Sequence, residues 1–139
     1  MLTTNQIWSY LESTPNFKGV YPCDAIPPFT QGSIIVNTDK KHEDGEHWVA
    51  LYLEEDKCLY FDSFGVPVLE QSIFSYLNKR YDRVIYNKYC IQDVWSTMCG
   101  HYCIGFVKNV TSVGEFDRYV SNYDFVHLKN NENIVLSLM

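Results

Sequence analysis

The protein has 139 residues, of which 46% are hydrophobic, 16% aromatic and 20% charged. This length suits one domain with one core, and the content of Tyr and Phe excludes a disordered chain. Eleven Lys and Arg against seventeen Asp and Glu leave a formal net charge of −6, without the basic excess that neutralises phosphates. We therefore expect a single domain over residues 1–139 and do not expect nucleic acid to be a main partner.

Targeting signals and a disulfide framework are both absent from the sequence pattern. The N-terminal segment has no basic stretch followed by an apolar one, and no run approaches the roughly 18 apolar residues of a membrane span. We therefore expect an intracellular protein that is neither secreted nor bound to a membrane. An odd number of irregularly spaced cysteines then indicates reduced thiols: Cys23, Cys58, Cys90, Cys99 and Cys103.

The N-terminal part of the chain predicts one short helix. Thr3 and Gln6 have the spacing of a capping box, and Pro15 terminates the helix that they begin. The following stretch, residues 19–28, is too rich in proline for a helix.

The middle of the chain predicts a sheet. Three apolar runs are typical of strands, at residues 33–36, 48–53 and 59–61, and the last two flank a turn as a hairpin. A further strand is expected at residues 84–86. Because these strands are apolar on both faces, helices must cover both faces of the sheet. Residues 67–80 predict one of them, with Pro67 in the first turn and an apolar stripe at Leu69, Ile73 and Leu77.

The clearest helix begins at Cys99. Its apolar residues recur at helical spacing, at Cys99, Tyr102, Cys103, Phe106, Val107 and Val110. Ser96 or Thr97 is expected as the N-cap residue. A short helix is expected at residues 116–120, and the pattern leaves the conformation of residues 134–136 open. The fold class is therefore α+β, with one sheet and helices on its faces.

Cys99 is a candidate nucleophile. At the start of a helix, unpaired backbone N–H groups and the helix dipole favour a thiolate over a thiol. The alternative is that Cys99 and Cys103 are small buried apolar residues, which is the commonest role of free cysteines.

A His–Asp pair follows from the register of the predicted hairpin. The turn pairs Leu53 with Cys58 and Leu51 with Tyr60, which places His47 and Asp62 on one face at a Cβ separation of about 7 Å. A carboxylate there would orient the imidazole and stabilise its protonated form. Alternatively, His47 is a loop residue and Asp62 a turn former, and a shift of one residue would separate the pair.

Gln92 precedes Cys99 by seven residues. A side-chain amide there, with the backbone N–H of Cys99, would supply the two donors of an oxyanion hole. The commoner alternative, for Gln92 taken alone, is an ordinary polar residue of a loop. A zinc site is the rival chemistry, but His101 lies about 200° around the helix from Cys99 and no further ligands stand at suitable spacing. We therefore expect no metal.

The order His47, Asp62, Gln92, Cys99 resembles that of adenovirus endopeptidase (adenain) and of the related ubiquitin-like-protein-specific, or deSUMOylating, cysteine proteases. The similar stretches are Phe17–Tyr21, Ile35–Thr38, Gly45–Trp48, Tyr60–Gly65, Gln92 and Cys99–Cys103, and together they extend from Phe17 to about Val107.

The resemblance implies a papain-like or adenain-like fold, with a central mixed sheet and the nucleophile at the N-terminus of the central helix. It implies that Cys99 is the nucleophile, His47 the general base and acid, Asp62 the group that orients His47, and Gln92 part of the oxyanion hole. It also implies that Trp48 borders the active site and binds substrate.

The sequence departs from this pattern in three places. Asp62 stands where adenain has Glu, Met98 stands where the deSUMOylating proteases carry Asp, and the chain is shorter than adenain after the central helix. Activation by DNA is therefore not expected. No residue requires a cofactor, and the resemblance permits an activating peptide.

The function expected from the resemblance is a cysteine endopeptidase that cuts after small residues, at Gly-Gly or Gly-X-Gly sites. An adenain-like chain implies a viral or mobile-element origin, with structural precursor proteins as substrates. The expected location is the host cytoplasm, the nucleus or the virion. We expect the protein to be a monomer. The alternatives are an isopeptidase that removes SUMO or ubiquitin, a non-catalytic module that binds Gly-rich tails, and an acyltransferase, for which no basic coenzyme site is found.

Overall fold

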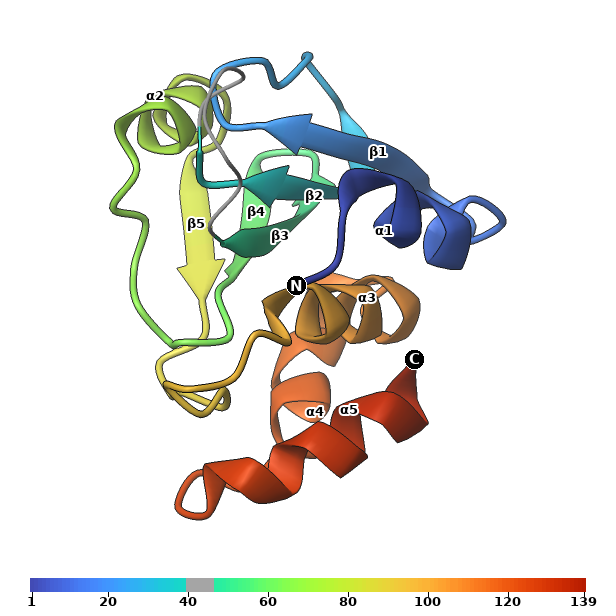
Figure 1. Ribbon diagram of the computed structural model, residues 1–139. Helices are drawn as coiled ribbons and strands as arrows, with labels where there is room; N and C mark the ends of the chain where they lie inside the picture. Colours follow the sequence, from blue (N-terminus) through green and yellow to red (C-terminus); the bar gives the residue numbers. More distant parts are fainter. Residues whose placement is uncertain (40–46) are drawn as a thin grey trace.

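The computed structural model describes residues 1–39 and 47–139 (Figure 1). Its strands are β1 (Phe17–Pro22), β2 (Gln31–Asn37), β3 (Trp48–Glu54), β4 (Lys57–Phe61) and β5 (Arg83–Tyr86). Its helices are α1 (Thr4–Leu11), α2 (Gln71–Arg80), α3 (Cys99–Asn109), α4 (Phe116–Val120) and α5 (Asn131–Leu138), with short 3-10 turns at Val113–Glu115 and Leu128–Asn130. Two residues of the stretches with family resemblance, Gly45 and Glu46, lie outside the described residues.

The five strands form one mixed sheet in the order β1-β2-β3-β4-β5. The two outer pairs, β1 with β2 and β4 with β5, are parallel, whereas the inner pairs are antiparallel. The β3–β4 hairpin pairs Leu53 with Cys58 and Leu51 with Tyr60, which confirms the predicted register. Because β4 and β5 run in the same direction, the residues that follow them lie at the same end of the sheet.

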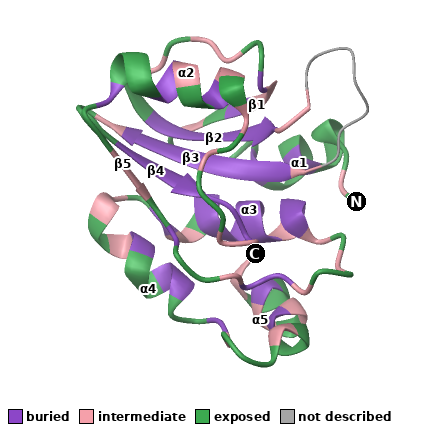
Figure 2. Cartoon of the chain, turned by 90° about the vertical axis from the view of Figure 1, so that its left-hand side faces the viewer, coloured by how far each residue is buried: buried purple, intermediate pink, exposed green. Residues whose placement is uncertain are grey.

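Helices cover both faces of the sheet, as predicted. Figure 2 shows α2 on one side and α3, α4 and α5 on the other. The residues of β3 alternate between two cores: Trp48, Ala50 and Tyr52 belong to the core beneath α1 and α3, while Val49, Leu51 and Leu53 belong to the core beneath α2. Strand β3 is therefore buried on both faces and packs against both layers of helices.

Three elements refine or correct the expectations. The Thr3–Gln6 capping box is present, and residues 134–136 belong to α5. Strand β1 was missed because its glycine and terminal Pro22 resemble a loop, yet proline is tolerated at the edge of a sheet, where β1 lies.

The predicted start of α2 at Pro67 is wrong. The helix begins at Gln71, after Glu70, whose carboxylate accepts the backbone N–H of Ile73 at 2.9 Å. Leu69 lies before the helix and is 77% exposed, so it is not part of the buried stripe. The helix therefore begins where the Glu70 side chain caps it, and not at Pro67, whose position suggested an earlier start.

Candidate active site

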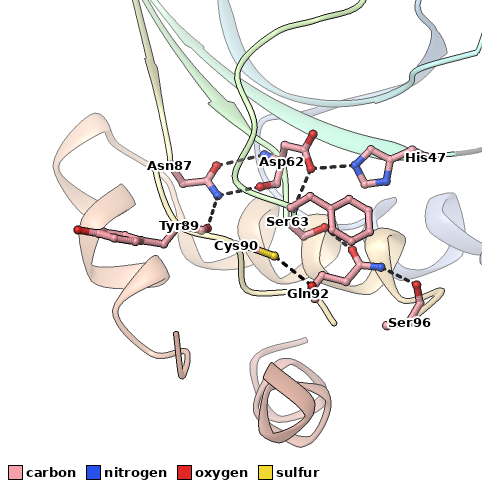
Figure 3. Close-up of polar contacts among 9 residues, drawn as sticks. His47, Asp62, Ser63, Asn87, Tyr89, Cys90, Gln92 and Ser96 are labelled. Atoms are coloured by element: carbon pink, nitrogen blue, oxygen red, sulfur yellow. Dashed lines mark hydrogen bonds and ion pairs between the residues drawn. The ribbon is translucent and has the colours of Figure 1, made fainter. Parts of the chain in front are cut away.

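His47 and Asp62 meet at one end of the central hairpin. His47 directly precedes β3 and Asp62 directly follows β4, and the imidazole Nε2 lies 2.9 Å from the carboxylate Oδ1 (Figure 3). The side chains are 17% and 5% exposed, respectively, so the pair is largely shielded from water. The structure thus contains the hydrogen bond that the hairpin register predicts.

Asn87 holds the backbone of Asp62 in place. Its Oδ1 accepts the N–H of Asp62 at 3.1 Å, and its Nδ2 donates to the carbonyls of Asp62 at 2.7 Å and Tyr89 at 3.3 Å. Asn87 follows β5 directly, and the parallel β4–β5 pair brings it beside the residue that follows β4. The sequence analysis missed Asn87, although a polar residue at the end of a predicted strand was a signal that could have found it.

The surroundings of His47 favour its protonated form. Burial alone lowers its pKa, but hydrogen bonding and charge interaction with Asp62 and with Cys99 outweigh burial and raise the pKa from 6.5 to about 9. The ring of Phe64 stacks on the imidazole at 5.0 Å between centroids. The raised pKa favours an imidazolium at neutral pH, which is hydrogen-bonded to the Asp62 carboxylate and interacts with the Cys99 thiol.

Cys99 is the first residue of α3 and is 2% exposed. The predicted N-cap at Ser96 or Thr97 is wrong, because Met98 is the cap residue and forms no side-chain cap hydrogen bond. The Ser96 hydroxyl accepts the backbone N–H of Met98 at 3.1 Å. Met98 precedes the first residue of α3, so this hydrogen bond does not cap an N–H group of the helix. The first turn of α3 therefore lacks a side-chain acceptor, which leaves its N–H groups available near the thiol.

The chain contains four other thiols, all of them free. Burial raises the pKa of each of them, in the case of Cys23 to about 11: Cys23, Cys58, Cys90 and Cys103. A raised pKa keeps a thiol protonated and unreactive at neutral pH. Cys99 is the best candidate nucleophile among the five, since it is the thiol whose interaction raises the pKa of His47.

Gln92 connects the Asp62 segment to the segment that leads into α3. Its Nε2 donates to the Ser96 carbonyl at 2.9 Å, its Oε1 accepts the hydroxyl of Ser63, and its backbone N–H donates to the Ser63 carbonyl at 3.1 Å (Figure 3). Gln92 is 1% exposed. Its amide therefore has a definite orientation, with the nitrogen toward the residues before Cys99.

Trp48 lies in the core at the N-terminus of α3. It is 4% exposed, its indole N–H donates to the Leu2 carbonyl at 3.0 Å, and its ring packs beside Gly100. These contacts place Trp48 between the N-terminal segment and the residue after Cys99. Its contact with substrate stays a prediction.

The last helix braces the loop that contains Gln92. Asn131, which is fully buried at the start of α5, donates through Nδ2 to the Ile91 carbonyl at 2.8 Å and to the Asp124 carbonyl at 2.7 Å. Phe64 and Gln92 also line a cavity of about 530 Å³, whose other wall is formed by residues 126–129. The C-terminal segment thus contributes both support and a surface next to the candidate site.

The turn after β4 gives a stability prediction. Gly65 has φ 70°, and a Cβ on it would lie 2.5 Å from the Tyr89 carbonyl carbon and 2.6 Å from the Cys90 nitrogen. We expect Gly65→Ala to lower the free energy of unfolding by about 2 kcal/mol or more, measured by urea denaturation. Gly114→Ala is the matched control, because nothing lies within 4 Å of its added methyl group. Equal effects of the two substitutions would contradict the close packing at Gly65.

The titration of His47 gives a prediction of pH dependence. Because its folded pKa of about 9 exceeds the 6.5 of an unfolded chain, its protonation stabilises the fold below about pH 6.5, and this contribution is lost as the pH rises through about 9. We expect an NMR titration midpoint near 9, which falls by about one unit or more in Asp62→Asn. Asp56→Asn, at the opposite end of the hairpin, should leave the midpoint in place. An unchanged midpoint in Asp62→Asn would show that the carboxylate does not hold the proton.

Within residues 1–39 and 47–139, no group of three or more His, Cys, Asp and Glu side chains is arranged to hold a metal ion. No helix in these residues has the length and hydropathy needed to cross a membrane.

Comparisons with known proteins give a likeness of fold. No protein-family profile and no curated protein sequence matches the chain. Among solved structures, a crystal structure of the ASFV pS273R protease is 17% identical with a TM-score of 0.56, and the match covers 92% of this chain and 64% of that protease. A selenomethionine crystal structure of the same protease is 17% identical with a TM-score of 0.47, covering 73% and 42%. The α+β fold with its five-stranded mixed sheet therefore resembles that of the ASFV pS273R protease, and a protease-like fold is what the family resemblance implies.

Proposed function

We propose that residues 1–139 form a single cysteine endopeptidase domain that acts on protein substrates. The observation that carries the proposal is the hydrogen bond between His47 and Asp62, with Cys99 on another side of the same imidazole. An imidazolium held between a carboxylate and a thiol at a helix N-terminus is the arrangement that activates a cysteine nucleophile. The likeness to a viral cysteine protease in fold supports the same reading.

In the proposed reaction, the Cys99 thiolate attacks the scissile carbonyl carbon and a C–S bond forms. The carbonyl oxygen takes the negative charge, which the backbone N–H of Cys99 and the Gln92 amide stabilise. His47 then gives its proton to the leaving nitrogen, and the C–N bond breaks. The products of this half are a free amine and a thioester on Cys99.

Water completes the cycle. Neutral His47 takes a proton from a water molecule, whose oxygen attacks the thioester carbon. The C–S bond then breaks, Cys99 leaves as a thiolate, and a carboxylic acid is released. Asp62 stays ionised throughout and keeps Nδ1 of His47 free for these proton transfers, because it binds Nε2.

We assign small residues, of the Gly-Gly or Gly-X-Gly type, to the substrate positions before the cut. This follows from the family resemblance, and the low exposure of Cys99 supports it, since a bulky side chain next to the scissile bond would have little room to enter. Structural precursor proteins of a virus or virus-like element are the substrates that the resemblance favours.

The test uses the whole chain and a peptide library with Gly-Gly and Gly-X-Gly sites, read out by mass spectrometry. Fluorogenic SUMO and ubiquitin conjugates form a second arm, which distinguishes an isopeptidase from an endopeptidase. Cleavage of library peptides by the wild type but not by Cys99→Ala is expected. Binding of Gly-rich peptides without cleavage in either arm would instead establish a non-catalytic module and overturn the proposal.

A further inference from the structure

Ser63 is a buried polar residue to which the proposed reaction gives no role. It follows Asp62 directly and is fully buried. Its hydroxyl donates to Oε1 of Gln92, and its carbonyl accepts the N–H groups of Ile91 at 2.8 Å and Gln92 at 3.1 Å (Figure 3). One residue therefore holds both the backbone and the side chain of Gln92.

The contact with Ser63 determines which end of the Gln92 amide faces Ser96, in the segment that leads to Cys99. A side-chain amide carries two N–H donors on its nitrogen and an acceptor on its oxygen. In the observed orientation Oε1 faces the Ser63 hydroxyl, one Nε2 hydrogen goes to the Ser96 carbonyl, and the second N–H is left for another acceptor. The reversed amide would direct its oxygen at the Ser96 carbonyl and would offer no donor to an oxyanion.

Ser63 also connects the His47–Asp62 pair to Gln92 within the candidate site. Asn87 holds the backbone of Asp62 on one side of Ser63, and the N–H of Gly65 closes a turn onto the Asp62 carbonyl at 2.8 Å on the other. The same short turn thus carries the acid that orients His47 and the hydroxyl that orients Gln92.

We infer that Ser63 is a positioning residue for the oxyanion hole. Its hydroxyl directs the free N–H of Gln92 at the oxygen of the carbonyl group whose carbon Cys99 attacks. This inference rests on the proposed protease function and adds a residue to it. Without the hydroxyl, the buried Oε1 loses its donor and the amide no longer has a single preferred orientation.

The test compares two reactions of Cys99 in Ser63→Ala. The thiolate adds to the carbonyl carbon of a peptide aldehyde ending in Gly-Gly, and the aldehyde oxygen takes the place of the oxyanion. With iodoacetamide, the thiolate attacks the methylene carbon, iodide leaves, and no oxyanion forms. We expect the affinity for the aldehyde and kcat for a cleaved peptide to fall by about 10- to 100-fold. This is somewhat less than the fall in kcat on the order of 100- to 1000-fold that follows removal of a whole oxyanion-hole donor. The alkylation rate should stay within about twofold, because the Cys99–His47 pair is unchanged.

A double-mutant cycle separates positioning from a structural effect. If Ser63 acts through Gln92, Ser63→Ala adds no further loss of aldehyde affinity in a Gln92→Ala background. The inference would be overturned if the losses of aldehyde affinity caused by Ser63→Ala and Gln92→Ala multiplied in the double variant. An alkylation rate of Ser63→Ala that falls by as large a factor as its kcat would also overturn it. If Ser63→Ala does not fold, Ser63→Cys keeps the position filled with a weaker donor, and an intermediate aldehyde affinity is expected.

Failure of this inference can be told apart from failure of the proposed function. A wild type that cleaves peptides and binds the aldehyde, with Ser63→Ala unaffected, removes only the role of Ser63. A wild type that neither cleaves peptides nor binds the aldehyde removes the protease function and the role of Ser63 with it.

Discussion

Replacing Cys99 with alanine is expected to abolish peptide cleavage, with a fall in kcat on the order of 10⁴-fold or more. The reason is that the proposed reaction needs a covalent thioester, and none of the other thiols contacts His47 in the structure. The fold should tolerate the change, because alanine is the smaller residue and Cys99 lies at the first position of α3. Initial rates on the best library peptide and a thermal melt give both quantities.

Cys103→Ala is the matched control for this prediction. Cys103 lies one turn further along α3 and is fully buried, and burial raises the pKa of its thiol well above the ordinary value. Its loss should lower stability by about 1 kcal/mol and leave kcat within a few-fold of the wild type. A Cys99→Ala protein that still cuts the peptide at a comparable rate would remove Cys99 from the reaction.

Replacing His47 with alanine is expected to change how the reactivity of Cys99 depends on pH. In the wild type, His47 keeps its proton up to about pH 9, so the thiolate has a cationic partner throughout the neutral range. In His47→Ala the alkylation rate should instead rise with pH as for an ordinary thiol, whose pKa is about 8.5. At pH 6 we expect the variant to react at least about 10-fold more slowly than the wild type.

The experiment measures iodoacetamide labelling at Cys99 by mass spectrometry between pH 5 and 9. His127→Ala is a suitable control, because His127 lies on the exposed surface beyond the Gln92 loop and makes no contact with Cys99 in the residues described. Identical profiles for wild type and His47→Ala would mean that the imidazole does not stabilise the thiolate. The proposed mechanism would then lose its base.

The hairpin shows what the sequence could predict. A short turn between two apolar runs determines the register, and the register places His47 and Asp62 together, so local information was enough for this pair. The stripe of α3 likewise follows from spacing within one helix. The fold class followed from strands apolar on both faces, because only helices on both sides can cover them.

The residues that were missed depend on contacts between distant segments. Asn87 reaches Asp62 because β5 runs parallel to β4, and no pattern within either strand reveals that pairing. Ser63 became significant once the Gln92 loop was seen to fold back onto it. The start of α2 depended on whether Glu70 or Pro67 controlled the first turn, which spacing alone does not decide.

The contact between Asn131 and the Ile91 carbonyl bears on how small an active fragment can be. The stretches that resemble known proteases end near Val107, yet a buried amide from α5 holds the residue next to Gln92. A version shortened to those stretches would keep the four proposed catalytic side chains and lose the hydrogen bond from Asn131 to the Ile91 carbonyl, next to Gln92. We therefore expect that a fragment must include α5 to keep the Gln92 loop in its observed conformation.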